Sequence, residues 1–368
     1  MTRLIRALID SAALRHNLGT IRAYAPGAKV MAVVKANAYG HGLVATALAL
    51  ADADSFAVAR LEEGMVLRSA GVRSSIVLLE GVFSAEQLAE ASQQGFELVV
   101  HDAQQLRLLE AYRGARRFVV WIKMDTGMNR LGFRPEAFAD ALGRLRDLTV
   151  QPLELRVMTH LARADERDEP MTHAQIERFE TTLTEAGVSV SAAGGHRLAT
   201  SIGNSAGTLG WPRAHGDWVR PGLALYGVSP FPGETAGRYG LKPVMTLEST
   251  VLAVREVKRG ESVGYAGAWR AERDSAIAIL AAGYGDGLPR HLENGTPVLI
   301  AGVRYPLVGR VSMDMIAVDV TDAPKVVAGN RGIVWGAGLP VEEVAAHADT
   351  IPYELLCGVS QRVPLELK

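Results

Sequence analysis

A lysine stands at the end of a short apolar run near the beginning of the chain. The run, residues 30–34 (Val-Met-Ala-Val-Val), is typical of a strand buried on both faces, and Lys35 follows it directly. Burial lowers the pKa of a lysine because the ammonium loses hydration, and the neutral amine can attack a carbonyl group. A lysine that only extends from a strand end into water is the alternative. Tyr39 and His41, the latter between two glycines, follow closely and favour a reactive site.

Strand-like and helix-like segments alternate from residue 29 to about residue 226, and these are the elements that must position Lys35. The strand-like runs are residues 30–34, 55–59, 76–79, 98–100, 118–122, 153–158, 197–201 and 217–220. Stretches with helical periodicity lie between them. The alternation predicts a parallel sheet, and eight runs predict an α/β fold with a closed (β/α)8 TIM-type barrel.

In such a barrel, the residues at the carboxyl ends of the strands share one rim, which is the catalytic face. The polar residues at the ends of the runs are Lys35, Arg60, Glu80, His101, Asp125, His160, Ser201 and Arg220. This ring is consistent with an active site, although solvated rims are polar in general.

The loops after runs seven and eight have the composition of an anion site. In residues 221–226 a proline at the first helical position precedes Gly222 and Leu223, whose N–H groups are free to meet an anion. Residues 201–207 add the hydroxyl of Ser205. Two ordinary loops of small residues are the alternative, but their places after strands seven and eight favour a phosphate site.

The composition and periodicity of the sequence change after Tyr226. Residues 228–240 are rich in glycine and proline and resemble a linker, and β-prone runs broken by turns follow. We therefore expect a barrel domain over residues 1–235 and a mostly-β domain over residues 236–368. Whether the short amino-terminal segment packs onto the second domain stays open.

Composition excludes several classes of protein. The chain has 368 residues, 48% hydrophobic and 21% charged, with a formal net charge of −1, which gives no reason to expect nucleic acid or an anionic membrane as a partner. Its single cysteine, Cys357, permits no intrachain disulfide, and no apolar run approaches the ~20 residues of a membrane span. The beginning of the chain lacks the apolar core of a signal peptide. We expect a cytoplasmic protein without a metal site.

The segment of residues 32–42, Ala-Val-Val-Lys-Ala-Asn-Ala-Tyr-Gly-His-Gly, resembles the pyridoxal-phosphate lysine motif of bacterial alanine racemases. The resemblance continues to the carboxyl terminus, and it implies that Lys35 holds pyridoxal 5'-phosphate as a Schiff base. It also implies interconversion of L-alanine and D-alanine, a step of D-alanine biosynthesis, by a homodimer. The resemblance assigns contacts with the cofactor phosphate to five residues, Tyr39, Ser205, Gly222, Leu223 and Tyr353.

Two further residues of the resemblance concern the cofactor ring. Arg220 matches the arginine that faces the pyridine nitrogen, and His160 matches the histidine that hydrogen-bonds this arginine. A guanidinium does not readily give up its proton, so the ring nitrogen stays unprotonated and the ring is a weaker electron sink. A weak sink disfavours a long-lived carbanion and discourages transamination. Taken alone, Arg220 and His160 would rate as ordinary surface and rim residues.

Racemisation needs a base on each face of the α-carbon of the cofactor aldimine. Lys35 serves one face, and Tyr265 resembles the second base of the family, which reaches the barrel of the partner subunit. Each active site is then shared between two subunits. Without the resemblance, Tyr265 would be read as an aromatic residue in a β turn.

The resemblance also assigns substrate contacts. Arg130 matches the arginine that binds the substrate carboxylate, and Met313 matches a methionine whose N–H contacts substrate from the second subunit. Lys123 matches a lysine that is carbamylated in many members of the family.

Three other functions compete with that of an alanine racemase. A decarboxylase is disfavoured because it would pair the ring nitrogen with an acid rather than Arg220. A non-enzymatic pyridoxal-phosphate carrier has no use for Tyr265 or a second domain. A racemase of broader substrate specificity is harder to exclude, although Tyr353 and a narrow entrance favour alanine.

Overall fold

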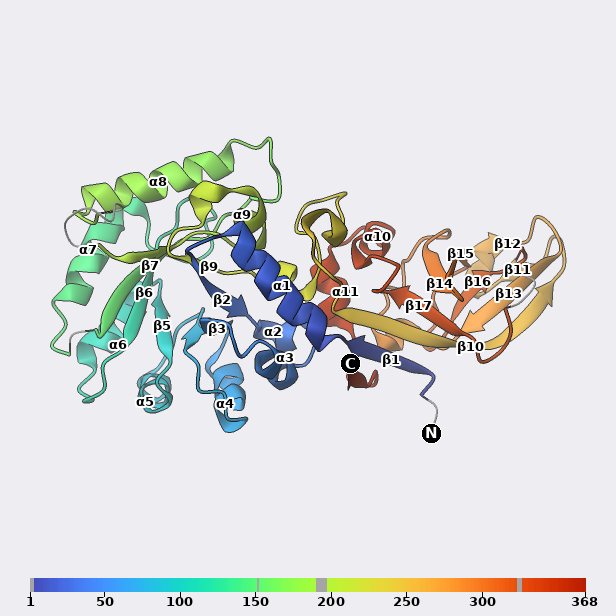
Figure 1. The fold of residues 1–368 in the computed structure, drawn as a ribbon, viewed down its shortest axis with the longest axis horizontal. Helices are drawn as coiled ribbons and strands as arrows, with labels where there is room; N and C mark the ends of the chain where they lie inside the picture. Colours follow the sequence, from blue (N-terminus) through green and yellow to red (C-terminus); the bar gives the residue numbers. More distant parts are fainter. Residues whose placement is uncertain (1–2, 151, 190–196, 323–325) are drawn as a thin grey trace.

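The computed structural model of the protein describes residues 3–150, 152–189, 197–322 and 326–368. The chain forms an elongated molecule in which a barrel surrounded by helices lies at one end and a β-rich part lies at the other (Figure 1). The (β/α)8 barrel followed by a mostly-β part confirms the predicted fold class.

Eight parallel strands close the barrel in the order in which they occur in the chain. They are β2 (Lys29–Val33), β3 (Ser55–Val58), β4 (Ile76–Leu78), β5 (Glu97–Val100), β6 (Val119–Lys123), β7 (Glu154–Met158), β8 (Ala199–Ser201) and β9 (Trp218–Val219). All residues of β3, β4 and β5 are buried, as expected for strands covered on both faces. Closure is made by β9 and β2, where Val219 pairs with Val30. All eight predicted strand runs are therefore barrel strands.

Helices cover the outside of the barrel, and short helices follow its last strands (Figure 1). They are α1 (Ser11–Tyr24), α2 (Lys35–Tyr39), α3 (Leu43–Ala49), α4 (Leu61–Ser69), α5 (Ala85–Gln94), α6 (Ala103–Ala111), α7 (Pro135–Arg146), α8 (Met171–Glu185), α9 (Ser205–Gly210), η1 (Pro212–Ala214), η2 (Leu223–Tyr226) and η3 (Ala236–Tyr239). Local sequence sets their ends. The side chain of Ser84 caps α5 by accepting the N–H of Gln87, and Gly95 ends the helix at φ +67°.

The β-rich part contains an eight-stranded sheet and a small hairpin. The sheet strands are β1 (Ile5–Ile9), β10 (Met245–Val257), β13 (Ser275–Leu280), β14 (Pro297–Ile300), β15 (Val303–Val308), β16 (Ile316–Asp319), β17 (Arg331–Trp335) and β18 (Leu365–Leu367). The hairpin is β11 (Ser262–Val263) and β12 (Trp269–Arg270), and the helical turns are η4 (Tyr265–Gly267), η5 (Tyr284–Asp286), α10 (Val341–Ala346) and α11 (Pro352–Gly358). Buried and partly exposed residues alternate at the start of β10, as in a sheet with one covered face.

The first strand of the chain belongs to this sheet and not to the barrel. β1 pairs with β10 in antiparallel and with β18 in parallel, so the amino-terminal segment packs against the β-rich part. The domain boundary that we place between residues 235 and 236 stays a prediction.

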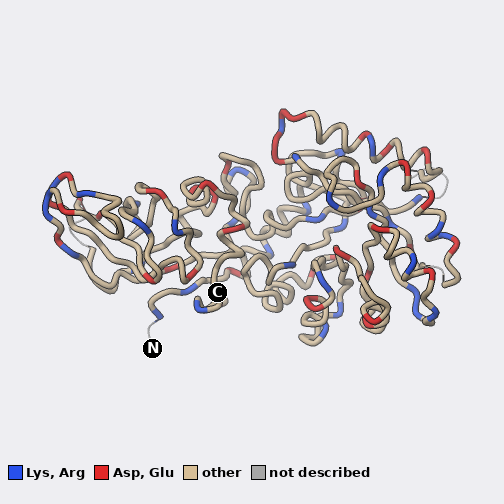
Figure 2. Tube along the Cα trace, turned by 180° about the vertical axis from the view of Figure 1, so that it is seen from behind, with Lys and Arg blue, Asp and Glu red and all other residues tan. Residues whose placement is uncertain are grey.

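Charged residues of both signs are interspersed along the whole molecule (Figure 2). Among the residues that the structure describes, no helix combines the length and the apolar character needed to cross a bilayer.

Candidate active site

The segment after β2 is a turn of left-handed helix. Ala36, Asn37, Ala38 and Tyr39 all have φ between +53° and +55°. For residues with a Cβ this conformation costs about 1–2 kcal/mol per residue, because Cβ crowds the following carbonyl oxygen. Lys35 is the first residue of the turn and is partly buried. A strained backbone of this length requires support from the rest of the fold.

One carboxylate provides part of that support. Glu63, in the first turn of α4, accepts the N–H of Ala36 through Oε1 at 2.7 Å and the N–H of Ala59 through Oε2 at 2.8 Å. The same side chain therefore ties the turn that carries Lys35 to the end of the neighbouring strand β3. Hydrogen bonds to an ionised acceptor are stronger than those between neutral groups.

His41 also supports the left-handed turn, through hydrogen bonds to its backbone carbonyl groups. Its Nδ1 lies 3.0 Å from the carbonyl oxygen of Ala38 and 2.9 Å from that of Tyr39, so Nδ1 carries the proton and donates to both. The imidazole stacks on the ring of Tyr226 at 4.5 Å, and the Tyr226 hydroxyl donates to the carbonyl oxygen of Val33 in β2. Complete burial lowers the pKa of His41 to about 4, so the ring is neutral.

Arg220 follows β9 and is enclosed within the barrel rim. Its guanidinium donates to Ser201 Oγ and to the carbonyl oxygens of Thr159 and Ile202. Burial lowers its pKa to about 10, so it remains charged at neutral pH. Nη2 lies 3.4 Å from Nδ1 of His160. Burial and the charge of Arg220 hold the pKa of His160 well below its ordinary value, so His160 is the acceptor in this contact.

Lys123, the last residue of β6, is a buried amine among other cations. Its pKa is lowered to about 8, first by burial and then by the positive charges of Arg220, Arg130 and Lys35. The charge of Asp125 acts in the opposite direction, but more weakly. The barrel rim therefore gathers four basic side chains with little carboxylate to balance them, which is the electrostatic environment of an anion site.

The segment that carries Arg130 is shaped by Asp125. Oδ1 of this buried aspartate accepts the N–H groups of Gly127 and Asn129, both at 3.0 Å, and Asn129 adopts φ +58°. Gly132 lies so close to this loop that a Cβ would stand 2.7 Å from the amide nitrogen of Asp125. The tight loop presents Arg130 on the exposed side of the rim.

The proposed phosphate loops are adjacent in space. Ser205 Oγ accepts the N–H of Gly222 at 3.0 Å and that of Ala224 at 3.2 Å. A Cβ on Gly222 would stand 2.4 Å from the hydroxyl oxygen of Tyr39. Leu223 begins η2, where the first amides have no intrahelical acceptor. Hydroxyls and amide groups from three separate segments therefore meet at one place on the rim.

α11 closes this side of the site. A Cβ on Gly40 would stand 2.1 Å from the carbonyl oxygen of Leu356, so the helix lies directly against the left-handed turn. The ring of Tyr353 is 5.7 Å from that of Tyr39, and burial raises its pKa to about 12. Cys357 lies within the electrostatic influence of Lys35.

Tyr265 and Met313 are not part of this group within one chain. Tyr265 begins η4 in the β11–β12 hairpin, at the end of the molecule away from the barrel (Figure 1). Its side chain is 63% exposed, and that of Met313 is 52% exposed. Their two loops are neighbours, because a Cβ on Gly264 would lie 3.7 Å from the amide nitrogen of Arg310.

The structure thus brings together all the site residues that we placed on the barrel and on α11. Two supporting residues, Glu63 and Asp125, had no assigned role in the sequence. Glu63 occupies the N3 position of α4, where a glutamate that accepts an N–H preceding the helix is a common signal. Asp125 lies two residues before a glycine, the spacing of an Asx turn, and was recognised only as a rim residue.

Comparisons with known proteins agree with this geometry. Residues 9–230 match the family model of the alanine racemase N-terminal domain, and residues 244–367 match that of the C-terminal domain. The chain is 49% identical over 359 residues to an alanine racemase of Nitrosococcus oceani and 48% identical over 363 residues to one of Aeromonas hydrophila, covering 98% of each protein.

Solved structures give the same result. The biosynthetic alanine racemase of Pseudomonas aeruginosa superposes with a TM-score of 0.94 at 43% identity, with complete coverage of both chains. The alanine racemase of Bartonella henselae, whose structure contains covalently bound pyridoxal phosphate, superposes with a TM-score of 0.88 at 30% identity, also with complete coverage. The chain belongs to the alanine racemase family.

Proposed function

We propose that this protein interconverts L-alanine and D-alanine with pyridoxal 5'-phosphate as its cofactor. Full-length identity of 49% and 48% to alanine racemases supports the reaction and the substrate. The observation that carries the proposal is the position of Lys35 on a strained turn beside Lys123, Arg130 and Arg220.

The residues present suit this cofactor. The phosphate is a dianion, and the rim offers four basic side chains together with the Ser205 hydroxyl, whose oxygen gathers the N–H groups of Gly222 and Ala224, and the N–H of Leu223 at the start of η2. The missing Cβ of Gly222 leaves space beside the Tyr39 hydroxyl for a close approach to backbone. In our assignment the phosphate is held by Tyr39, Ser205, Gly222, Leu223 and Tyr353.

The cofactor supplies an electron-withdrawing ring that makes the α-proton of a bound amino acid acidic. Arg220 is suited to hydrogen-bond the ring nitrogen without protonating it, because its guanidinium remains charged and is held by Ser201 and two carbonyl oxygens. His160 contacts Nη2 of Arg220 and helps to keep it in place.

Two groups move the proton in our assignment. The Lys35 amine accepts or returns it on one face of the α-carbon, and the Tyr265 phenol acts on the other face. Arg130 holds the substrate carboxylate with its planar guanidinium, and the N–H of Met313 makes a further substrate contact. Glu63 and His41 keep the turn of Lys35 in place and so set the direction of its amine.

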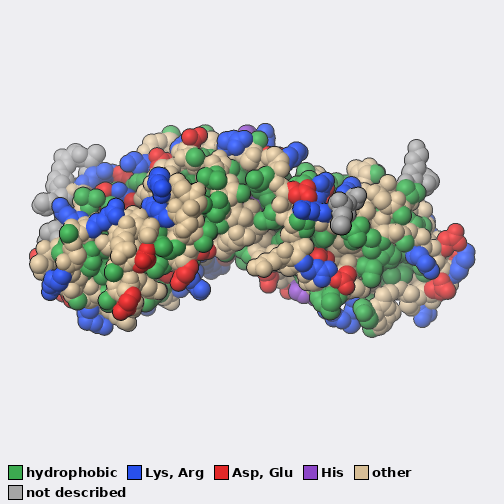
Figure 3. All heavy atoms as spheres, turned by 90° about the horizontal axis from the view of Figure 1, so that it is seen from below, with side chains coloured by type: hydrophobic (Ala, Val, Ile, Leu, Met, Phe, Trp, Pro, Cys, Tyr) green, Lys and Arg blue, Asp and Glu red, His purple; other side chains and the backbone are tan. Residues whose placement is uncertain are grey.

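The mechanism requires two copies of the chain, arranged head to tail. The β11–β12 hairpin that carries Tyr265 lies at the end of the molecule away from the barrel, too far for this residue to serve Lys35 of its own chain (Figure 1). The large side chains around its hairpin and the neighbouring loops are exposed, namely Tyr265, Tyr284, Met313 and Met315. Hydrophobic side chains also gather on the β-rich half when it is viewed from below (Figure 3). Such a surface suits burial against the barrel of a partner subunit.

Lys123 is suited to carbamylation. Its lowered pKa leaves an appreciable fraction of neutral amine at pH 7.5, and that amine can add to carbon dioxide with release of one proton. The resulting carbamate is an anion and would offset the repulsion from Arg130, Arg220 and Lys35. ¹³C-bicarbonate should give a carbamate resonance that is absent in Lys123→Met.

We also place the enzyme in a reducing compartment such as the cytoplasm. Its one cysteine, Cys357, is a free thiol that is exposed in the single chain.

The proposal is tested by two measurements on the same preparation. Borohydride reduction followed by peptide mapping should fix the cofactor to Lys35 and leave Lys35→Ala unlabelled, while Lys242→Ala, which changes an exposed lysine, behaves as the native chain. α-Proton exchange in D₂O across a panel of amino acids should be fast for both alanine enantiomers and slow for larger ones. Labelling of another lysine, or binding without exchange, would leave only a cofactor carrier. Comparable exchange of large amino acids would establish a racemase of broader specificity.

A further inference from the structure

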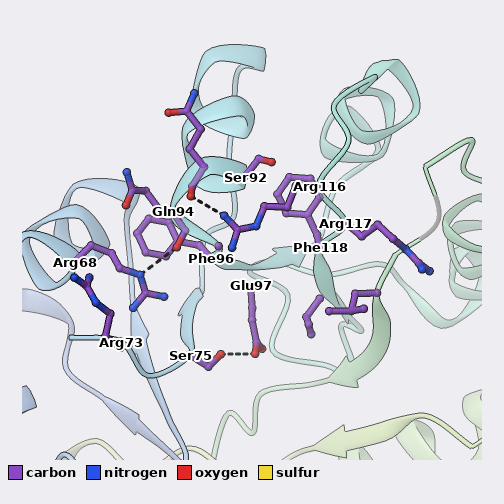
Figure 4. Close-up of a pocket in the computed structure, with 14 residues that line it drawn as sticks. Arg68, Arg73, Ser75, Ser92, Gln94, Phe96, Glu97, Arg116, Arg117 and Phe118 are labelled. Carbon is purple, nitrogen blue, oxygen red and sulfur yellow. Dashed lines mark hydrogen bonds between the residues drawn. The ribbon is translucent and has the colours of Figure 1, made fainter. Parts of the chain in front are cut away.

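A cavity lies at the opposite end of the barrel from Lys35. It has a volume of about 510 Å³, within the range of small-molecule sites. Its walls come from the loops that lead into β4, β5 and β6 and from the last turns of α4 and α5 (Figure 4). Four of its lining residues are arginines, namely Arg68, Arg73, Arg116 and Arg117.

The cavity has almost no negative charge to balance these arginines. The only carboxylate among its lining residues is that of Glu97, which is buried. Oε2 of Glu97 accepts the indole N–H of Trp121 at 2.7 Å and an N–H of Arg156 at 3.1 Å, and Oε1 accepts the hydroxyl of Ser75. Both oxygens of Glu97 are therefore engaged with Ser75, Trp121 and Arg156, so this carboxylate forms no ion pair with Arg68, Arg73 or Arg116.

Arg68 is held rigidly at the wall. Nε donates to the carbonyl oxygen of Gln94 at 3.1 Å, and Nη1 donates to those of Val72 and Ser74, both at 2.8 Å. Its guanidinium also lies over the ring of Phe96. A side chain fixed in this way loses little entropy when it binds a ligand.

Arg116 and Arg73 face Arg68. Nη1 of Arg116 donates to the carbonyl oxygen of Gln93 at 2.7 Å, and its approach depends on Gly95, where a Cβ would stand 2.9 Å from Nη2. Within the described part of the chain, Arg73 has no hydrogen bond or ion pair. Burial lowers the pKa of Arg68, and the positive charges of Arg73 and Arg116 lower it further. Two guanidinium groups therefore repel that of Arg68 at the wall of one cavity.

We propose that this cavity binds an oxyanion with at least two negative charges, of the phosphate or pyrophosphate class. Guanidinium groups recognise phosphate oxygens by paired N–H donors, and a dianion would relieve the repulsion among Arg68, Arg73 and Arg116. Because these residues belong to consecutive βα units, a bound anion would join α4, α5 and the loop before β6. The proposal does not depend on the racemase reaction, whose residues lie at the other rim.

Calorimetric titration of the cofactor-saturated enzyme with sodium pyrophosphate, at ionic strength held constant with sodium chloride, tests this site. We expect saturable binding that becomes about tenfold weaker in Arg73→Gln, the change typical of losing one charged hydrogen-bond partner. Arg15→Gln removes the same charge from the exposed surface of α1 and should bind as the native chain does. Pyrophosphate should also raise the unfolding temperature of the native enzyme and of Arg15→Gln, and raise that of Arg73→Gln by less at the same concentration.

Racemase activity should be equal in all three proteins, since neither arginine is near Lys35. Absence of saturable binding would overturn the proposal, and so would equal affinity in Arg73→Gln and Arg15→Gln. Release of pyridoxal phosphate during the titration would show that pyrophosphate binds at the cofactor site instead, and would overturn it as well.

Discussion

Gly222→Ala tests the proposed phosphate cradle with a single methyl group. Gly222 has φ −116°, outside the left-handed region that favours glycine. The added Cβ would stand 2.4 Å from the Tyr39 hydroxyl oxygen, whereas ordinary contacts begin at 3.4 Å, so the hydroxyl must move by about 1 Å. The Tyr39 ring is confined, since it lies 4.9 Å from the ring of Tyr226 and 5.7 Å from that of Tyr353.

A displacement of this size removes the hydroxyl from hydrogen-bonding range of a bound phosphate. Loss of one hydrogen bond to a charged group costs about 1.5–3 kcal/mol, which corresponds to roughly tenfold to hundredfold weaker cofactor binding. Overpacking should also lower the free energy of unfolding by about 1–3 kcal/mol. Absorbance titration of the apoenzyme with pyridoxal phosphate measures the first quantity, and urea denaturation of the apoenzyme measures the second.

A double-mutant cycle separates this mechanism from general damage. Tyr39→Phe alone should weaken cofactor binding by a similar factor, and Gly222→Ala in the Tyr39→Phe background should add little, because the hydroxyl is already absent. Gly143→Ala, in α7 with no atom within 4 Å of the added Cβ, is the matched control and should bind the cofactor normally. Native affinity in Gly222→Ala, or fully additive effects in the double variant, would refute the cradle.

Three further predictions concern the bases and the turn. Tyr265→Ala should retain cofactor binding and lose most racemisation, as assayed by coupled D-alanine oxidation. Mixed dimers of Tyr265→Ala with the inactive Lys35→Ala should regain one active site in the same assay. The neutral state of His41, whose pKa falls from 6.5 to about 4, stabilises the fold above pH 6.5. This contribution of about 3 kcal/mol should be lost as the pH falls from 6.5 to 4, and urea titrations should show a flatter profile in His41→Asn. Glu63→Ala frees the N–H groups of Ala36 and Ala59 and should lower kcat more than it raises KM for alanine.

Each of these has a clear contrary result. Full activity of Tyr265→Ala in both directions would make this residue structural, and absence of complementation would argue against a shared site. An unchanged pH profile in His41→Asn would show that another group governs acid stability. If Glu63→Ala retained the native kcat, the left-handed turn would not need its carboxylate to aim Lys35.

Much of the fold could be predicted from local patterns. The run before Lys35 is a continuous apolar segment, which marks a strand buried on both faces, and the other barrel strands also left local signals, weakest for β8 and β9. Local sequence signals some elements only weakly: Pro306 interrupts the apolar pattern of β15, and α11 has only seven residues. The contacts of β1 with β10 and β18 join the two ends of the chain, so no local pattern could decide them.

The sequence by itself determined which chemical groups the protein has and the order in which they reach the barrel rim, because strand ends in a closed barrel must share one face. Tertiary structure decided how those groups behave. The left-handed turn depends on Glu63 and His41, and the lowered pKa of Lys123 depends on burial beside Arg130 and Arg220. These effects arise between atoms a few ångströms apart whose residues lie tens of positions apart in the chain. Only the folded barrel brings them within range of one another.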